Sequence, residues 1–309
     1  MNIRQLELFM AIVRTGSFQG AAKDSFTTQS TVSQHIALLE EELGVQLLER
    51  SRGGVWMTEA GKALYGHARN VIGELTAARE AITDLSRAGN GTLRIAASTV
   101  PATYLVPAAL AAMGECFPGI SVDLRQRNSG QVAELLLEHR SDVGVVGQKP
   151  EEKSLTGEFL LKEEICLVCG PRHPWAGRRS VGVSEFKDTP FVARTEGSGT
   201  EKTVLEKLQA KGADLDSHNV KLRVETSESV KAAVAAGIGV SFLSRLAASA
   251  EIARGELVCV PVDGLKIERD FFLIRRATFR MNKVASAFWE EMIRTCWDGN
   301  REKSGRASA

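Results

Sequence analysis

The feature that most constrains this fold is a regular apolar stripe in the stretch from residue 64 to residue 85. Its members lie 4, 3, 4, 3, 4 and 3 residues apart and are Leu64, Ala68, Val71, Leu75, Ala78, Ile82 and Leu85. This spacing predicts one long helix with a single narrow apolar seam, which suits packing against a partner helix. A second copy of the chain and the chain's own C-terminal domain both remain possible partners. We expect a linker helix over residues 59–88, capped by Thr58, and a hinge at 89–91.

The chain has 309 residues and can therefore form a domain on each side of this helix, because single cores stop growing near ~250 residues. Hydrophobic residues make up 43% and charged residues 25% of the chain, which is typical of globular proteins and excludes a disordered or fibrous class. No stretch reaches the ~18 to 20 apolar residues of a membrane helix, and Met1–Phe9 does not resemble a secretory signal. We expect a cytoplasmic protein with no membrane partner.

The cysteines and histidines predict neither a disulfide framework nor a metal site. Cys166 and Cys169 form a CxxC motif inside an apolar run that is typical of a buried strand, where their odd spacing places them on opposite faces. This favours small core residues over redox or metal use. The five histidines lie far apart in the sequence, so we expect no metal and no cofactor.

Residues 1–58 have the pattern of three short helices followed by a hairpin. Apolar residues recur at helical spacing from Ile3 to Val13 and again from Val32 to Leu43, with a short helix expected over Phe18–Asp24 between them. Gly16 and Gly44 are expected to end the first and third helices, and Ser17 to cap the second. The outer face of the third helix carries small or amide residues, namely Ser30, Ser33, Gln34 and Ala37.

Such an uncharged face can enter a major groove, where hydroxyl and amide groups read base edges. The expected hairpin, or wing, over residues 45–58 contains Arg50 and Arg52, which suit phosphate or minor-groove contacts. The first 58 residues hold five Lys or Arg against six Asp or Glu, so bulk charge does not indicate nucleic acid. From periodicity alone, DNA binding and a mere packing role remain equally open.

Motifs along this segment resemble the DNA-binding half of LysR-type transcriptional regulators. The resemblance rests on Leu6-Glu7-Leu8-Phe9, Gly16-Ser17-Phe18, Ala21-Ala22, Gln29 to Ile36, Leu39 to Val45, Leu48-Glu49-Arg50 and Met57 to Gly61. It implies a winged helix-turn-helix that binds double-stranded DNA as a homodimer, through an antiparallel pairing of residues 64–85. It also implies that the bases are approached by Gln29, Ser30, Thr31, Ser33 and Gln34, and the backbone by Arg50 and Arg52. Ser25 and Thr27 depart from the family, which usually has apolar residues there; either the core under the turn is less well packed, or the turn binds a different partner.

From Thr92 the pattern changes to short apolar strands that alternate with helices. The strands are expected around Leu93–Ala97, Ile120–Leu124, Val143–Val146, Cys166–Val168, Phe191–Ala193, Val240–Leu243, Leu257–Val260 and Phe271–Ile274. This alternation predicts an α/β domain with helices on both faces of the sheet, over residues 92–297. The tail from Asp298 to 309, rich in Arg, Gly and Ser, is expected to be disordered.

Three segments fit the carboxyl ends of strands, where open α/β sheets bind ligands. Ser98 and Thr99 precede a helix expected near Ala102, so their hydroxyls and free amides suit an anion or an ordinary cap. The glycine-rich stretch 195–200 suits a backbone nest or a plain turn, with Thr195, Ser198, Gly199 and Thr200 as its candidate ligands. The third segment is Thr226-Ser227-Glu228, where we expect Ser227 to act as a helix N-cap.

This half also resembles the family's effector domain, which is similar to periplasmic solute-binding proteins. The resemblance implies two lobes joined by two crossings: lobe I (about 92–161 plus 267–297) and lobe II (about 162–266). We expect a small oxyanion or carboxylate effector between them, held by neutral donors without lysine or arginine. Contacts between effector domains are expected to give a homotetramer.

Two other function classes compete with the regulator. A solute-binding protein would explain residues 91–297 but has no use for residues 1–88. An enzyme acting on a small carboxylate or phosphate would need a catalytic group in the cleft. The candidate segments contain only hydroxyls and one carboxylate, Glu196. A regulator that is not an enzyme is therefore the leading interpretation.

Overall fold

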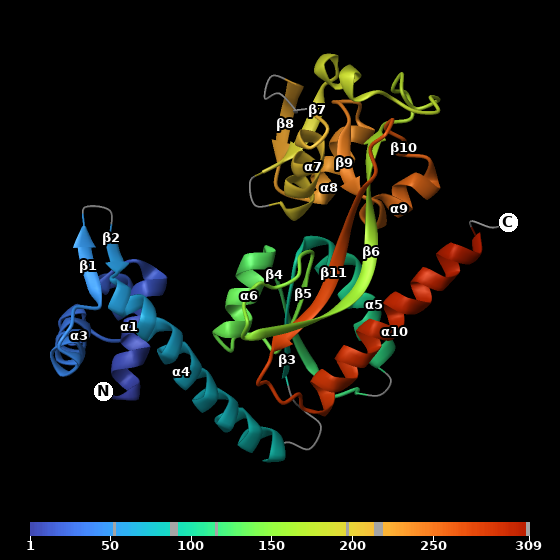
Figure 1. Cartoon of the computed structure of the whole chain (residues 1–309). Coiled ribbons are helices and arrows are strands. Elements are labelled where there is room, and N and C mark those ends of the chain that lie inside the picture. The colour runs from blue at the N-terminus through green and yellow to red at the C-terminus, as the bar shows by residue number, and fades with distance from the viewer. Residues whose placement is uncertain (52–53, 87–91, 115–116, 196–197, 213–218, 307–309) are drawn as a thin grey trace. The chain divides into compact units, whose positions relative to one another are not determined.

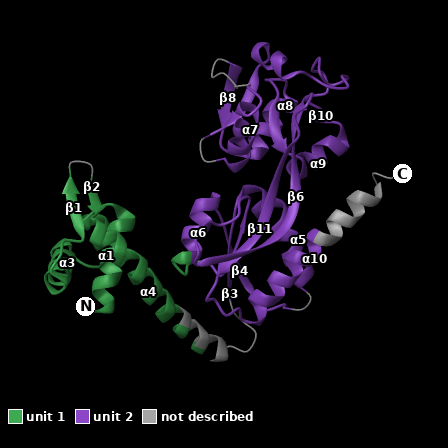
Figure 2. Ribbon diagram, in the orientation of Figure 1, with its two compact units in different colours: residues 1–89, 137–140 green, residues 90–136, 141–309 purple. Residues whose placement is uncertain are grey.

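A computed structural model describes residues 1–51, 54–86, 92–114, 117–195, 198–212 and 219–306. The chain divides into two compact units, residues 1–89 with 137–140 and residues 90–136 with 141–309 (Figure 2). Each unit is described by itself. Arg52 in the expected wing and the expected hinge at 89–91 lie outside the described residues.

The first unit begins with the three expected helices. They are α1 (Ile3–Thr15), α2 (Phe18–Asp24) and α3 (Gln29–Leu43). Gly16 and Gly44 end α1 and α3 with φ of 69° and 68°, a left-handed conformation that glycine adopts at little cost. The Ser17 hydroxyl accepts a hydrogen bond from the Gly20 N–H at 3.0 Å and caps α2. These boundaries confirm the sequence predictions.

Packing of these helices gives a small core completed by a hairpin and by the start of a long helix. Strands β1 (Leu48–Ser51) and β2 (Gly54–Met57) pair antiparallel and form the expected wing. The core contains Leu8, Phe9, Ile12, Val32, Ile36 and Leu39, all buried. Helix α4 (Glu59–Ser86) follows, and Thr58 caps it by accepting from the Gly61 N–H at 3.0 Å.

The apolar stripe of α4 serves two different environments along its length. Leu64 packs on the core of the first unit, and Ala68 is only 1% exposed. Val71 and Ile82 are 46% and 69% exposed. The N-terminal end of the stripe is therefore used inside the protomer, which the heptad spacing could not reveal, whereas Val71 and Ile82 are open in the single chain. The Leu85 side chain is outside the described residues.

The second unit is built on a seven-stranded mixed sheet with helices on both sides (Figure 1). The strand order is β10-β6-β11-β5-β3-β4, and β9 also pairs with β6. The strands are β3 (Thr92–Ala97), β4 (Ser121–Gln126), β5 (Val143–Val146), β6 (Leu155–Cys169), β9 (Ser241–Ser244), β10 (Val258–Val260) and β11 (Ile267–Arg276). A separate parallel pair consists of β7 (Phe191–Arg194) and β8 (Val220–Val224), of which β8 was not predicted.

Two long antiparallel strands, β6 and β11, run through both lobes of this unit (Figure 1). Their register extends from Leu155 opposite Arg276 to Ile165 opposite Ile267, with an irregularity between Phe271 and Phe272. Beyond Ile165, β6 pairs with β9 and β10 instead. The two chain crossings between the lobes, expected near residues 161 and 267, are thus parts of one continuous ladder between β6 and β11.

The two lobes have separate cores. In lobe I, side chains of the sheet such as Ile95 and Phe271 pack against Phe288 and Met292 of helix α10 (Lys283–Arg306). In lobe II, the sheet carries one buried cluster on each face, and Cys166 and Cys169 belong to different clusters. The predicted placement of these cysteines on opposite faces of a strand is confirmed.

Helices flank the sheet and bring helix starts to its strand ends. They are a π-helical turn η1 (Pro101–Leu105), α5 (Val106–Met113), α6 (Ser129–Leu137), a 3-10 turn η2 (Val183–Asp188), α7 (Gly199–Gln209), α8 (Ser227–Ala235), α9 (Arg245–Arg254) and α10 (Lys283–Arg306). Helix α10 continues to Arg306, beyond Asp298, where the tail was expected to begin. A helix already anchored in the core can extend through Arg301 to Lys303, because arginine, glutamate and lysine are good helix formers. None of the helices in the described ranges has the length and apolar character needed to cross a membrane.

Candidate functional site

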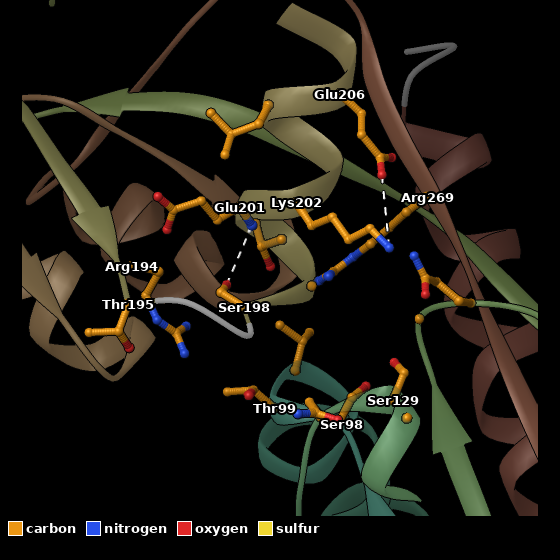
Figure 3. A pocket seen from close by; sticks show the side chains of 18 of the residues that line it. Ser98, Thr99, Ser129, Arg194, Thr195, Ser198, Glu201, Lys202, Glu206 and Arg269 are labelled. Atoms are coloured by element: carbon orange, nitrogen blue, oxygen red, sulfur yellow. Dashed lines mark hydrogen bonds and ion pairs between the residues drawn. The ribbon is translucent and has the colours of Figure 1, made fainter. Parts of the chain in front are cut away.

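A cavity of about 1430 Å³ in the second unit is lined by residues from both lobes. All six predicted effector-site residues line it: Ser98, Thr99, Thr195, Ser198, Gly199 and Thr200. Figure 3 shows Ser98, Thr99 and Ser129 on one side, facing Arg194, Thr195 and Ser198 on the other. The structure therefore brings together two segments about 100 residues apart in the sequence, and we call this space the interlobe cavity.

On the lobe I side, Ser98 and Thr99 follow the end of β3 and are half-buried. The Ser98 N–H donates to the Val145 carbonyl at 2.8 Å, so this amide is not free for a ligand as the sequence analysis expected. Strand β5 requires that hydrogen bond because it pairs with β3. The helix expected near Ala102 begins as the π-helical turn η1, a rare element that is frequent at functional sites.

The lobe II side is the start of α7. Ser198 caps this helix, since its hydroxyl accepts from the Glu201 N–H at 3.4 Å, and Thr200 is buried in its first turn. The helix N-terminus thus faces the cavity with its partial positive charge. Glu196 and Gly197, which the sequence analysis placed in a backbone nest, lie outside the described residues.

Arg194 at the end of β7 also lines the cavity, and sequence reasoning gave it no role. Its Nη1 donates to the Ser227 hydroxyl at 2.9 Å, whereas its buried Nε has no partner among the described residues. Burial lowers the pKa of the Arg194 guanidinium; nearby Glu201 opposes this, and the positive charge of Arg269 adds to it. The expectation that Ser227 caps α8 is wrong, because the Thr226 hydroxyl accepts from the Ser229 N–H and Ser227 is the first helical residue.

Arg269 on β11 is a deeply held charge of the cavity. Its side chain is 8% exposed, and its Nε donates to Glu163 at 2.7 Å on the neighbouring strand β6. The guanidinium carbon lies 4.7 Å from the centre of the Phe271 ring, and Ser244 donates to Glu163 from the other side. Within the described part of the chain, Nη2 of Arg269 is buried without a hydrogen-bond partner. Buried polar groups are nearly always hydrogen-bonded in proteins. The N–H groups of Nη2 are therefore donors for which an acceptor is expected.

These side chains make the cavity charged, and the expectation of purely neutral donors is corrected. Its cationic lining residues are Arg127, Arg194, Lys202, Arg223 and Arg269. Glu201 lies among them, and burial raises the pKa of its carboxyl despite the opposing effects of Arg194 and Arg223. Lys202 pairs with Glu206 at 4.0 Å, and both are exposed (Figure 3). No short sequence pattern marks Arg269, because its partner Glu163 is 106 residues away.

A second contact links the lobes away from the cavity. The Tyr104 hydroxyl of lobe I donates to Glu228 of lobe II at 2.6 Å, and the buried Lys231 ammonium lies 3.3 Å from the same hydroxyl. Lys231 also contacts Glu228 at 2.9 Å and Glu251 at 3.0 Å. Burial alone would lower the pKa of Lys231, but these partners hold it above its ordinary value.

In the first unit, the structure displays the predicted DNA-reading face, which comprises Gln29, Ser30, Thr31, Ser33 and Gln34. Gln29, Ser30 and Gln34 are exposed, and the other two are partly exposed. Arg50 in the wing is exposed, with its guanidinium carbon 4.2 Å from the centre of the Phe18 ring. A groove of about 510 Å³ runs between α3 and the wing and is lined in part by Ser33, Ala37 and Arg50. The described residues contain no group of three His, Cys, Asp or Glu side chains placed to hold a metal.

Comparison with known proteins identifies both units. Residues 3–62 match the family model "Bacterial regulatory helix-turn-helix protein, lysR family", and residues 86–297 match "LysR substrate binding domain". The chain is 30% identical to the HTH-type transcriptional activator CmpR of Synechocystis, over 94% of this chain and 95% of that protein.

Two solved structures share the fold. The regulatory domain of Synechocystis CcmR in complex with 2-PG has a TM-score of 0.61 and 27% identity, covering 67% of this chain and 97% of that one. Full-length CbnR with its target DNA has a TM-score of 0.54 and 21% identity, covering 96% and 100%. Relatives such as CmpR are transcriptional regulators and not enzymes. The chain therefore belongs to the LysR family of DNA-binding transcriptional regulators, with an N-terminal helix-turn-helix and a C-terminal effector domain.

Proposed function

We propose that this regulator is controlled by a small oxyanion or carboxylate bound in the interlobe cavity. The observation that carries the proposal is Arg269: a guanidinium that lines the cavity, is held in place by Glu163, and has a buried Nη2 without an acceptor. A buried donor of this kind favours an acceptor strongly, and a guanidinium matches a carboxylate or phosphate in geometry and charge.

Other groups around the cavity favour the same ligand class. Arg194 supplies a second guanidinium, and the start of α7 supplies a helix N-terminus. Ser98 and Thr99 supply hydroxyls from the opposite lobe, so one anion can contact both lobes. The related CcmR domain binds 2-PG, which supports a small-molecule effector at the corresponding domain of this chain.

The DNA-reading face and the wing are the proposed duplex contacts. Gln29, Ser30 and Gln34 present amide and hydroxyl groups that suit base edges, and Arg50 suits a phosphate. The solved complex of CbnR with its target DNA supports this use of the fold. We place this activity in the cytoplasm, where bacterial DNA is accessible.

The homodimer is proposed to form through the exposed part of the α4 stripe. Ile82 is 69% exposed in the single chain, and a heptad seam buries such residues against a partner helix. Ile82→Glu would bury a carboxylate in the dimer but leave the protomer core intact. Sedimentation at micromolar concentration should show a smaller species for this variant, and an unchanged mass would contradict the seam. A tetramer through the effector domains stays a prediction.

Calorimetry with 2-PG, sulfate and inorganic phosphate tests the effector proposal on the full chain. For an anion that binds, Arg269→Lys keeps the charge but loses the planar guanidinium, and should weaken binding by about 1.5 to 3 kcal/mol. Thr99→Val and Ser198→Ala should each cost about 0.5 to 1.5 kcal/mol. Lys266→Met is the matched control, because Lys266 is exposed, pairs with Glu268 and is not among the residues that line the cavity. Equal affinity in wild type and Arg269→Lys would place the effector elsewhere.

A further inference from the structure

The turn between α2 and α3 contains an aromatic residue that the fold does not use. Phe26 is 99% exposed, the highest value among the exposed large apolar side chains in the described ranges; the next is Ile82 at 69%. It follows the end of α2 and precedes Thr28, the cap of α3. The core of this unit contains Phe18 but not Phe26.

Backbone geometry at this position is unusual and firmly held. Phe26 has a φ of 51°, and among the described residues only one other non-glycine residue, His139, has a positive φ. The N–H groups of Ser25 and Thr27 donate to the carbonyls of Ala21 and Ala22, each at 2.9 Å. In addition, Arg4 donates to the Ser25 carbonyl at 3.1 Å. Several hydrogen bonds therefore hold the turn in the conformation that exposes the ring. The exposure is not a result of fraying.

The exposure of Phe26 does not benefit the folded domain, and a phenylalanine does not suit the conformation of this turn. An exposed phenylalanine forgoes the gain from burial, and a left-handed conformation is strained for a residue with a Cβ. Unfavourable features of this kind persist where they serve a function. The neighbours Ser25, Thr27 and Thr28 are polar, so the Phe26 ring is the one large apolar group that this turn presents.

The position of Phe26 indicates what the ring meets. Phe26 lies three residues before Gln29, at the N-terminal end of the helix that carries the DNA-reading face. In helix-turn-helix proteins this end of the recognition helix lies closest to the base edges. The C5-methyl group of thymine is the apolar group that a base pair presents in the major groove, and an aromatic ring is a known partner for it.

We infer that Phe26 is a specificity-determining residue that packs on a thymine methyl group beside the bases read by α3. This inference rests on the DNA-binding role of the DNA-reading face and adds an apolar contact to its polar ones. A contact of this kind selects thymine over cytosine, which has no methyl group. It also predicts preference for thymine over deoxyuridine, which pairs identically and differs by that methyl alone.

The test uses a duplex selected by the full-length wild-type chain from a randomised pool. Each thymine is replaced in turn by deoxyuridine, and affinities are measured for wild type, Phe26→Ala and Phe26→Gly. At one thymine per half-site, deoxyuridine should weaken wild-type binding about four-fold, as expected for one methyl group, and should have no effect on either variant. Phe26→Gly keeps the fold testable, because glycine tolerates the positive φ.

Phe159→Ala, which truncates an aromatic residue in the effector domain, should retain the full deoxyuridine effect. The inference is overturned if no thymine is sensitive in the wild type, or if every sensitive thymine stays equally sensitive in Phe26→Gly. Failure of the wild type to select any duplex would instead contradict the DNA-reading face itself.

Discussion

The interlobe cavity and the DNA-reading face both suit negatively charged partners, yet they are built in opposite ways. The cavity holds a guanidinium, Arg269, that is 8% exposed and fixed by Glu163. The DNA-reading face has exposed amides and hydroxyls such as Gln34 and Ser30, and the exposed charge nearby belongs to Arg50 in the wing. A small anion must be extracted from water by groups already in place, whereas a duplex supplies its own dense charge and has to be distinguished by base edges.

The largest expected effect concerns the buried charge itself. Glu163→Gln removes the counter-charge of the buried Arg269 guanidinium, and should lower the free energy of unfolding by about 3 kcal/mol. Arg14→Ala breaks an exposed pair with Asp24 in the first unit and should cost less than about 1 kcal/mol. Urea unfolding followed by tryptophan fluorescence compares the two variants. Similar losses in both would show that the two regions do not differ in the way their charges are held.

The next-largest effect tests whether the DNA-reading face selects bases without contributing charge to duplex binding. Gln34→Ala should remove about 1 to 3 kcal/mol of preference between the selected duplex and its variants at one base pair, without changing the salt slope. Arg50→Ala should weaken all duplexes alike and reduce the salt slope by about one unit. Binding titrations at several salt concentrations separate these outcomes. An altered salt slope for Gln34→Ala would contradict the division between reading and charge.

A smaller effect is expected from the acidic residue in the cavity. Glu201 lies near Arg194, and burial raises the pKa of its carboxyl above the ordinary value of 4.5. Protonation therefore begins at a higher pH than for an exposed glutamate, and it removes a negative charge from the cavity. If sulfate binds, its affinity should rise as pH falls from 7 to 5 in the wild type. Glu201→Gln should bind sulfate about 1 kcal/mol more tightly at pH 7 and lose this pH dependence.

The smallest effect concerns the contact between the lobes at Tyr104. Tyr104→Phe removes a hydrogen bond to Glu228, whose side chain is 63% exposed, and should cost about 0.5 kcal/mol of stability at pH 7. Burial would raise the pKa of Glu228, but Tyr104 and Lys231 outweigh it and hold the pKa below 4.5. The contribution is therefore present above pH 4.5 and lost as pH falls through the lower folded value. Thermal unfolding of both proteins should converge at acid pH, and a difference that grows with acidity would contradict this sign.

Local sequence patterns predicted local structure well. Glycine and hydroxyl residues at helix ends fixed the boundaries at Gly16, Ser17 and Gly44, because caps depend on neighbours within a few residues. Periodicity also predicted the wing and most strands of the effector domain. At Thr226 and Ser227 two adjacent hydroxyls compete for one cap, and the sequence does not decide between them.

The cavity was only half predictable. Ser98 and Ser198 could be found because each follows a strand and opens a helix. Arg269 could not be found, because it stands inside a strand and its role depends on Glu163 across a ladder between distant segments. Burial of a charge is a tertiary property, and no spacing in the sequence records it.

The ladder between β6 and β11 also makes lobe II an insertion into lobe I. The chain leaves lobe I along β6 and returns along β11, where Ile165 stands opposite Ile267. Everything between these two residues is bounded by one pair of adjacent strands, the arrangement in which one domain is inserted into another. Residues 166–266 could therefore be exchanged as a block with the equivalent segment of a relative. Such a chimera would combine the arginine at 269 and the hydroxyls of lobe I with a foreign α7, and so graft a new ligand preference onto an unchanged DNA-binding half.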